Sequence, residues 1–96
     1  MAITRRVIVL GSTGSIGTQA LDIIRSNGFT VAGLSAGGSQ VALLAAQVNE
    51  FNVPVVAVAD ADSAQELRGL ISPTVEVLVG DDAAAILAAR DCDVVL

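Results

Sequence analysis

The chain contains no histidine, lysine, tyrosine or tryptophan and a single cysteine, Cys92. General acid–base catalysis uses histidine, lysine, tyrosine or carboxylate side chains, so only the carboxylates remain as candidates. A lone cysteine without histidine forms neither an internal disulfide nor a metal site nor a Cys–His pair. We therefore expect Cys92 to be a small buried or edge residue, and we expect the protein to work in the reducing cytoplasm.

Basic and aromatic residues are also scarce. The five basic residues are all arginine, the net charge is −5, and aromatic residues make up 2% of the chain. Nucleic-acid sites need a basic patch and often aromatic side chains, so we expect no nucleic-acid partner. No segment approaches the ~20 apolar residues of a membrane span, and the apolar run after Arg6 is too short for a signal peptide. We expect no membrane partner either.

The acidic residues favour helix caps over metal ligands. Asp60, Asp62, Asp81 and Asp82 fall at expected helix starts. There a carboxylate accepts hydrogen bonds from backbone amides and complements the helix dipole. A site for a hard cation needs several converging oxygen atoms. We identify no catalytic residue and no metal ligand in the chain.

The most informative motif follows an apolar run, Val7–Leu10. Glycines come next at Gly11, Gly14 and Gly17, with a G-x-x-G-x-x-G spacing. Gly11 can adopt a positive φ at a sharp turn, Gly14 lets the backbone approach a bulky anion, and Gly17 lets a helix pack tightly on the strand. The amides and the dipole at the helix start favour a pyrophosphate. The motif therefore predicts a dinucleotide or phosphate site, and the alternative is a purely structural turn.

Strands and helices alternate along the chain. The chain is 53% hydrophobic, mostly Ala, Val, Leu and Ile, which is typical of a parallel sheet buried on both faces. We predict an α/β fold, a Rossmann-like doubly wound parallel sheet that is truncated after the start of the fifth strand. Since the chain ends inside this strand, we expect an N-terminal fragment that lacks its catalytic and C-terminal domains. The predicted strands span 6–10, 30–35, 55–59, 74–79 and 93–96, and the predicted helices span 15–26, 41–49, 63–70 and 82–89.

Local signals predict how the helices begin, end and face the core. Gly28 suits the left-handed position after the first helix, and Ser39 is expected to cap the second. Residues 63–66 read Ser-Ala-Gln-Glu, the pattern of a capping box. The first helix is expected to carry four apolar residues on or near one face, Ile16, Ala20, Ile23 and Ile24. The second is expected to turn Leu44, Ala45 and Val48 inward.

The end of the second strand indicates which dinucleotide is bound. NAD sites place a carboxylate here, on the ribose 2′-hydroxyl, and such a carboxylate would repel the 2′-phosphate of NADP. Residues 33–40 contain no acidic residue. Ser39 and Gln40 offer neutral donors, and Gly37 and Gly38 allow close backbone approach. We therefore expect an NADP-binding domain over the whole chain, although Ser39 and Gln40 could also serve only to begin a helix.

The sequence Gly-Ser-Thr-Gly-Ser-Ile-Gly at 11–17, with Thr-x-x-Leu-Asp at 18–22, closely resembles the start of the 1-deoxy-D-xylulose 5-phosphate reductoisomerase family. The resemblance continues over 31–38, 56–60 and 75–80. It covers essentially the whole chain, and it is far more specific than the glycine spacing alone.

The resemblance implies where NADPH lies. One common family pattern in the second loop is Gly-Lys-Asn, whereas this chain has glycine at the lysine position. This departure leaves open what recognises the 2′-phosphate. The residues implied for the phosphates and the nicotinamide side are Thr13, Gly14, Ser15 and Ile16, and those implied for the adenosine 2′-phosphate are Gly37, Gly38, Ser39 and Gln40.

The resemblance also implies a reaction. Members of the family rearrange a small phosphorylated sugar, 1-deoxy-D-xylulose 5-phosphate, and reduce it with NADPH to 2-C-methyl-D-erythritol 4-phosphate, in the non-mevalonate route to isoprenoids. A divalent metal, Mg²⁺, Mn²⁺ or Co²⁺, holds the substrate oxygens, and the metal and substrate residues of the family lie beyond Leu96. We expect a homodimer at full length and no activity of this chain alone. Two other interpretations stay open: a non-catalytic dinucleotide-binding regulatory module, and an NADP-dependent dehydrogenase of the aspartate-semialdehyde type.

Overall fold

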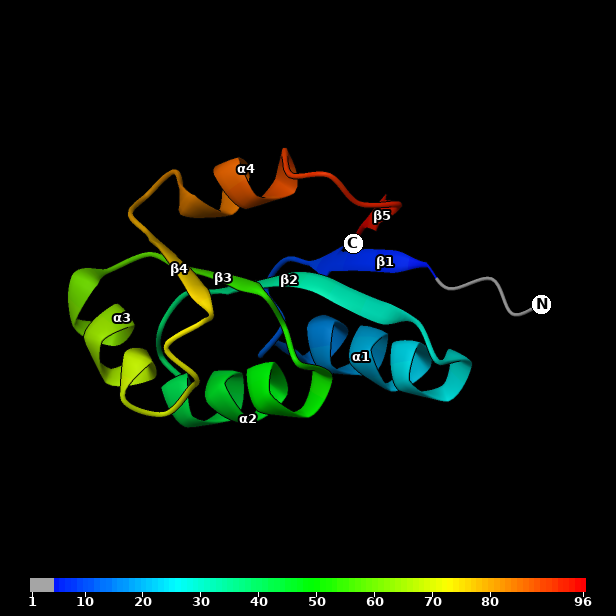
Figure 1. The fold of residues 1–96 in the computed structure, drawn as a ribbon, viewed down its shortest axis with the longest axis horizontal. Coiled ribbons are helices and arrows are strands. Elements are labelled where there is room, and N and C mark those ends of the chain that lie inside the picture. The colour runs from blue at the N-terminus through cyan, green and yellow to red at the C-terminus, as the bar shows by residue number, and fades with distance from the viewer. Residues whose placement is uncertain (1–4) are drawn as a thin grey trace.

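The computed structural model describes residues 5–96. Strands and helices alternate as predicted, with small shifts at their ends (Figure 1). Among these residues, no helix combines the length and the hydropathy needed to cross a bilayer. The strands are β1 (Arg6–Val9), β2 (Thr30–Ala36), β3 (Val55–Val58), β4 (Glu76–Val79) and β5 (Val94–Val95), and the helices are α1 (Ser15–Asn27), α2 (Val41–Phe51), α3 (Ala61–Arg68) and α4 (Ala83–Ala88).

The strands form one parallel sheet with the order β4-β3-β2-β1-β5. Because the chain crosses from β4 at one edge to β5 at the other, the strand order reverses between β1 and β5. Helices α1, α2 and α3 cover one face, and α4 covers the other (Figure 1). The doubly wound prediction is therefore confirmed. Such sheets bind ligands outside the carboxyl ends of the strands, where the order reverses.

Each face of the sheet has its own apolar cluster. Val7 and Val9 belong to the larger cluster, with the inward faces of α1, α2 and α3. Ile8, between them, packs in the smaller cluster with Leu87 of α4. Successive strand residues point to opposite faces, so the short β1 serves both clusters. Cys92 is half-buried against the smaller cluster, as expected.

Helix α1 packs on the core with Ile24 and the half-buried Ala20, as predicted, but not with Ile16 and Ile23. Its buried residues are Gly17, Leu21 and Ile24. Ile16 is 83% exposed and Ile23 is 61% exposed, so the prediction that these two share one face with Ile24 is wrong. Gly17 packs closely against the turn at Gly11 and Ser12, and the buried stripe continues from it at helical spacing.

The caps of α3 and α4 also differ in detail from the prediction. Asp60, not Ser63, begins α3, because the Asp60 carboxylate accepts a hydrogen bond from the Ser63 amide at 3.0 Å. The capping box is therefore wrong, whereas the capping role of Asp60 is confirmed. Asp82 occupies the N-cap position of α4 without a side-chain cap bond. Gly28 ends α1 with φ of 68°, as predicted.

The two helices beside the glycine turn begin without side-chain caps. The N-cap of α1 is Gly14, so neither Thr13 nor Ser15 caps this helix. The N-cap of α2 is Gln40 rather than Ser39, and its side chain makes no cap bond. The prediction that Ser39 caps α2 is therefore wrong. The polar side chains at both helix starts are not committed to capping.

Replacing Gly17 by alanine will destabilise the fold. A Cβ here would overlap the Gly11 carbonyl oxygen and lie 2.7 Å from the Ser12 Cα, so the helix and the turn would have to separate. We expect Gly17→Ala to lower the free energy of unfolding by about 1–3 kcal/mol, the usual cost of overpacking, or more. Urea unfolding followed by circular dichroism measures this loss.

Gly69→Ala is the matched control. Gly69 ends α3 with a right-handed φ of −74°, and the nearest atom to a Cβ there is 3.5 Å away. This substitution should leave stability unchanged or slightly raised. Equal losses from the two substitutions would contradict the close packing of α1 on the turn.

Candidate functional site

The glycine turn lies at the carboxyl end of β1, beside β5, where the strand order reverses. A hollow of about 400 Å³ opens there. It therefore has the location that doubly wound sheets use for their ligands. It is walled by the end of β1, the first turns of α1 and the residue after β5: Val9, Leu10, Gly11, Gly14, Ser15, Ile16, Gly17, Ala20 and Leu96.

The turn has the conformation that its glycine spacing predicts. Gly11 has φ of 67°, in the left-handed region. Gly14 donates its amide to the Gly11 carbonyl at 3.1 Å, and its own carbonyl accepts the Thr18 amide at 2.9 Å. The amides of Ser15 and Ile16 begin α1 and have no acceptor within the helix. They lie at the positive end of a 13-residue helix, which favours an anion.

A second, smaller hollow of about 220 Å³ adjoins the first at Gly11. It is bounded by the ends of β2 and β3 and by the start of α4. Because both hollows share Gly11, an elongated ligand along this edge of the sheet would contact both. The residues of the second hollow are Gly11, Ala36, Gly37, Ala57, Val58, Ala59, Gly80, Asp81 and Ala84.

The loop after β2 is held by two neighbours. Gly38 has φ of 108°, and the Ser63 hydroxyl donates to its carbonyl at 3.3 Å. A Cβ on Gly38 would lie 2.5 Å from Ser63 Oγ and 2.8 Å from Asp60 Oδ1. A side chain at this position would therefore require the Ser63 and Asp60 side chains to move, and any residue other than glycine would be strained at this φ. Gln40 Nε2 donates to the Thr13 carbonyl at 3.5 Å, which joins this loop to the glycine turn.

The predicted site residues all lie at the carboxyl edge of the sheet, in two segments. One segment is the glycine turn with the start of α1, and the other is the loop between β2 and α2. Gly14, Ser15, Ile16 and Gly37 line the hollows, whereas Thr13, Gly38, Ser39 and Gln40 lie in the same segments without lining either.

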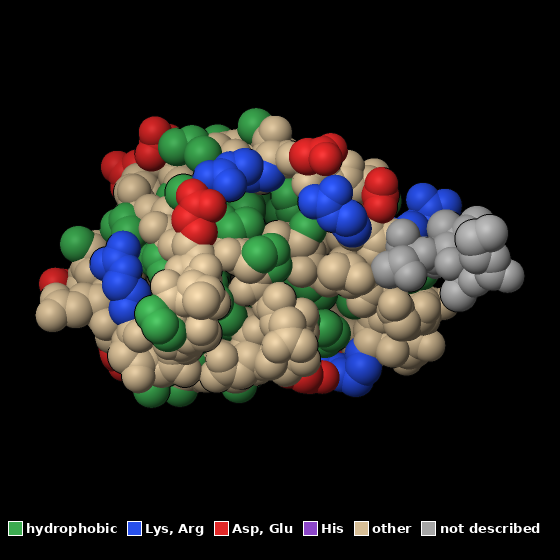
Figure 2. Space-filling view, viewed as in Figure 1, with side chains coloured by type: hydrophobic (Ala, Val, Ile, Leu, Met, Phe, Trp, Pro, Cys, Tyr) green, Lys and Arg blue, Asp and Glu red, His purple; other side chains and the backbone are tan. Residues whose placement is uncertain are grey.

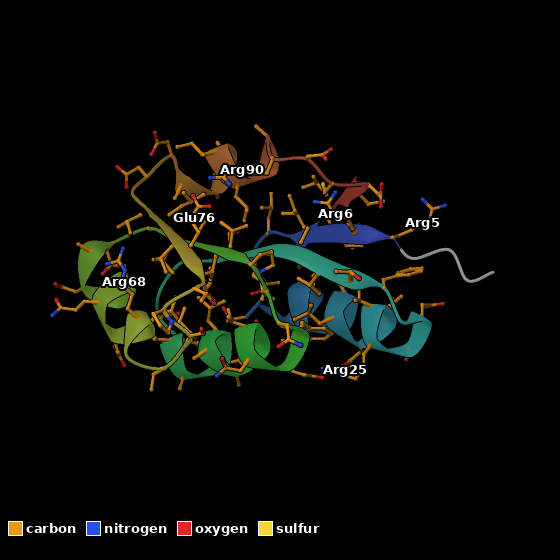
Figure 3. All side chains as sticks on the ribbon, in the orientation of Figure 1. Arg5, Arg6, Arg25, Arg68, Glu76 and Arg90 are labelled. Carbon is orange, nitrogen blue, oxygen red and sulfur yellow. The ribbon has the colours of Figure 1, made fainter. Side chains whose placement is uncertain are left out.

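The charged side chains pair with one another away from the hollows. Arg25 hydrogen-bonds both carboxylate oxygens of Glu50 and so holds the pKa of Glu50 below its usual value. Arg90 bonds both oxygens of Glu76, at 3.1 and 2.7 Å, and likewise lowers the pKa of Glu76. Figure 2 shows basic and acidic side chains side by side over the upper part of one face, and Figure 3 shows Arg90 beside Glu76. Within residues 5–96, no arginine lines either hollow. An anion in the larger hollow would meet amides and the Ser15 hydroxyl, whereas the smaller hollow also presents the Asp81 carboxylate.

The acidic residues at this edge do not converge. Asp60 caps α3, and Asp81 lines the smaller hollow. In the part of the chain that the structure describes, no group of three or more His, Cys, Asp or Glu residues could hold a metal ion.

Sequence reasoning missed three buried polar residues beside the turn: Ser12, Ser35 and Gln47. The sequence did carry a signal for one of them. Gln47 falls on the inward face of α2 between Leu44 and Val48, which are buried as predicted. An amide at such a position, where an apolar residue is expected, indicates a specific hydrogen-bonding role.

The strand order, the glycine turn and the adjoining hollows define the class of protein, an α/β domain of the dinucleotide-binding type. Comparison with known families gives a match over residues 7–96 to 1-deoxy-D-xylulose 5-phosphate reductoisomerase. The chain therefore belongs to the 1-deoxy-D-xylulose 5-phosphate reductoisomerase family, as the resemblance of its glycine turn predicts.

Curated relatives match nearly the whole chain. The 1-deoxy-D-xylulose 5-phosphate reductoisomerase of Cutibacterium acnes is 52% identical, over 95% of this chain and 25% of that protein. The enzyme of the same name from Beutenbergia cavernae is 53% identical, over 96% of this chain and 25% of that protein. The chain thus spans about a quarter of the length of the curated relatives that it matches.

Solved structures share the fold. The 1-deoxy-D-xylulose 5-phosphate reductoisomerase from Zymomonas mobilis, in complex with NADPH, has a TM-score of 0.87 and 31% identity, over 97% of this chain and 25% of that one. A DOX-P reductoisomerase in complex with NADPH, fosmidomycin and magnesium has a TM-score of 0.74 and 29% identity, over 95% of this chain and 23% of that one.

The cap at Asp60, which also borders the loop after β2, will make stability depend on pH. The Ser63 amide lowers the pKa of Asp60 by donating a hydrogen bond to its carboxylate. The stabilisation is therefore complete above the unfolded pKa of about 4 and is lost as the pH falls through the folded pKa. We expect the difference in melting temperature between wild type and Asp60→Asn to be larger at neutral pH than in acid.

Asp62→Asn, in the first turn of the same helix, controls for the loss of one negative charge there. The difference in melting temperature between wild type and Asp62→Asn should change less with pH than the difference between wild type and Asp60→Asn. Thermal melts of the three proteins across the acid range provide the comparison. A pH-independent difference for Asp60→Asn would contradict the role of the ionised carboxylate.

Proposed function

We propose that this chain binds NADPH at the carboxyl edge of its sheet, as the N-terminal cofactor-binding part of a 1-deoxy-D-xylulose 5-phosphate reductoisomerase. The observation that carries the proposal is the glycine turn, which opens α1 where the strand order reverses between β1 and β5. Family membership and the NADPH complexes of two relatives support it. The proposed domain covers 1–96, of which the first four residues lie outside the described part.

In this proposal the pyrophosphate lies against the start of α1. The amides of Ser15 and Ile16 donate to its oxygens, with Thr13 and Gly14 beside them. The nicotinamide end occupies the larger hollow, where the exposed Ile16 side chain offers an apolar surface to the ring. The adenosine end lies toward the smaller hollow, and its 2′-phosphate reaches the loop 37–40, whose polar side chains are neutral.

For the whole protein we propose the reaction of the family, the rearrangement and reduction of 1-deoxy-D-xylulose 5-phosphate. NADPH supplies the hydride, and a divalent metal, Mg²⁺, Mn²⁺ or Co²⁺, holds the substrate oxygens. The residues of this chain bind and orient the dinucleotide. Since they include no histidine, lysine or tyrosine, the proposal assigns acid–base groups and metal ligands to the part of the relatives' length that the chain does not span.

Family membership favours this function over an aspartate-semialdehyde-type dehydrogenase or a regulatory module. A homodimeric state at full length, a cytoplasmic location and the inactivity of this chain alone stay predictions. An assay of the full-length gene product with the phosphorylated sugar distinguishes an enzyme, which turns the sugar over, from a non-catalytic module, which does not.

Calorimetric titration with NADPH and then NADH tests the cofactor proposal directly. We expect saturable binding of NADPH that is tighter than that of NADH, in the protein at the length its gene encodes. Binding of neither dinucleotide would contradict the proposed function. Equal affinity would contradict a role of the loop 37–40 in reading the 2′-phosphate.

Ser15→Asp will separate binding from stability. A carboxylate in the first turn of α1 interacts favourably with the helix dipole, by about 0.3–1 kcal/mol, so the melting temperature should hold or rise. The same charge repels the pyrophosphate. We expect the affinities for NADPH and NADH both to fall at least about tenfold, which corresponds to about 1.4 kcal/mol.

Ser26→Asp adds the same charge at the opposite end of the same helix. At 1.5 Å per residue it lies roughly 16 Å from position 15, beyond the Debye length of about 8 Å at physiological salt. It should leave both affinities unchanged. Unaltered NADPH binding by Ser15→Asp would show that the phosphates lie elsewhere.

A further inference from the structure

Three polar side chains are buried together beside the glycine turn. Ser12 is 0% exposed, Ser35 is 5% exposed and Gln47 is 6% exposed. They come from the turn, from β2 and from α2, respectively. Burying an amide or a hydroxyl is unfavourable unless its hydrogen bonds are made. In residues 5–96 no buried side-chain nitrogen or oxygen lacks a partner, so each buried polar side-chain atom of the cluster makes at least one hydrogen bond.

Gln47 holds Ser12 by two hydrogen bonds. Ser12 Oγ donates to Gln47 Oε1 at 2.8 Å, and Gln47 Nε2 donates to the Ser12 carbonyl at 2.9 Å. The two bonds use the carbonyl oxygen and the amino group of the Gln47 side chain. They therefore fix the side chain and the backbone of Ser12 at the same time.

Strand β2 holds the same segment from its other side. The Ser12 amide donates to the Ser35 carbonyl at 2.9 Å, and the Gly11 amide donates to Ser35 Oγ at 3.2 Å. The turn is thus bonded to α2 and to β2 at once. Thr13 and Gly14 follow directly and lead into α1, so these bonds determine where the first amides of α1 point.

We propose that Gln47 is a positioning residue for the dinucleotide site, which holds the turn through Ser12 so that the amides of Ser15 and Ile16 are presented to the pyrophosphate. An apolar side chain of similar length, such as methionine, would fill the same space in the core. Unlike methionine, the glutamine amide forms two hydrogen bonds with Ser12. Donors fixed in advance bind an anion without the cost of ordering the turn. The inference rests on the proposed function.

Gln47→Met tests this role in the protein at the length its gene encodes. We expect the folded variant to bind NADPH at least about tenfold more weakly, and NADH by the same factor, because the pyrophosphate is common to both. In the active enzyme KM for NADPH should rise by this factor while kcat at saturation is kept. A residue that only stabilises the fold would lower the melting temperature without changing the affinity of the folded protein, and that result would overturn the inference.

Gln47→Glu provides a second, conservative variant. The protonated acid can accept from Ser12 Oγ and donate to the Ser12 carbonyl, whereas the carboxylate has no donor. Burial raises the pKa of a carboxyl. The affinity of Gln47→Glu for NADPH, relative to that of wild type, should therefore recover as the pH falls from about 8 to about 6. Gln47→Met should stay weak over the same range. The absence of recovery in Gln47→Glu would count against the inference even if Gln47→Met failed to fold.

Gln65→Met, at an exposed position of α3, is the matched control and should bind NADPH as wild type does. The outcomes separate the two proposals. If wild type binds neither dinucleotide, the proposed function fails and the inference fails with it. If wild type binds NADPH and folded Gln47→Met binds it equally well, only the inference fails.

Discussion

The close approach of α1 to the glycine turn is the contact on which the site depends. Gly17 packs against the Gly11 carbonyl and the Ser12 backbone with no room for a side chain. This contact places the N-terminus of α1 over the end of β1, and the buried stripe of the helix then follows at Leu21 and Ile24. The larger hollow exists because the turn and the first turns of α1 meet in this way. Gly17 is therefore both a buried residue of α1 and a lining residue of the larger hollow.

The carboxyl edge of the sheet is built to hold an anion with its backbone. The arginines of the ion pairs at Glu50 and Glu76 are engaged elsewhere, and among the described residues no arginine lines either of the two hollows beside the glycine turn. The structure explains why position 38 is glycine: the Asp60 and Ser63 side chains at the start of α3 occupy the space that a side chain would need. Recognition of a 2′-phosphate in this chain would then depend on amides, hydroxyls and the start of α2, which act at short range. Preorganisation of the turn matters more in such a site than in one that attracts its ligand with charged side chains.

The sequence predicts the fold and the shape of the glycine turn well, because both follow from short-range patterns, whereas the binding of a dinucleotide at this turn stays a prediction. Apolar runs fix the strands, and the spacing of Gly11, Gly14 and Gly17 fixes the turn. What it mispredicts depends on packing between distant segments. Ile16 matches a helical stripe by spacing, but contact at Gly17 rotates it to the surface. The bonds between Ser12 and Gln47 join residues 35 positions apart, and no local pattern indicates such a pairing.

A crystal structure of the protein with NADPH tests the central claim most directly, since the claim concerns where the pyrophosphate lies. The account predicts pyrophosphate oxygens at about 3 Å from the amides of Ser15 and Ile16, with the nicotinamide in the larger hollow. It would be contradicted by a dinucleotide bound at the amino edge of the sheet, beside Arg6 and Arg90, with the first turn of α1 left open to solvent.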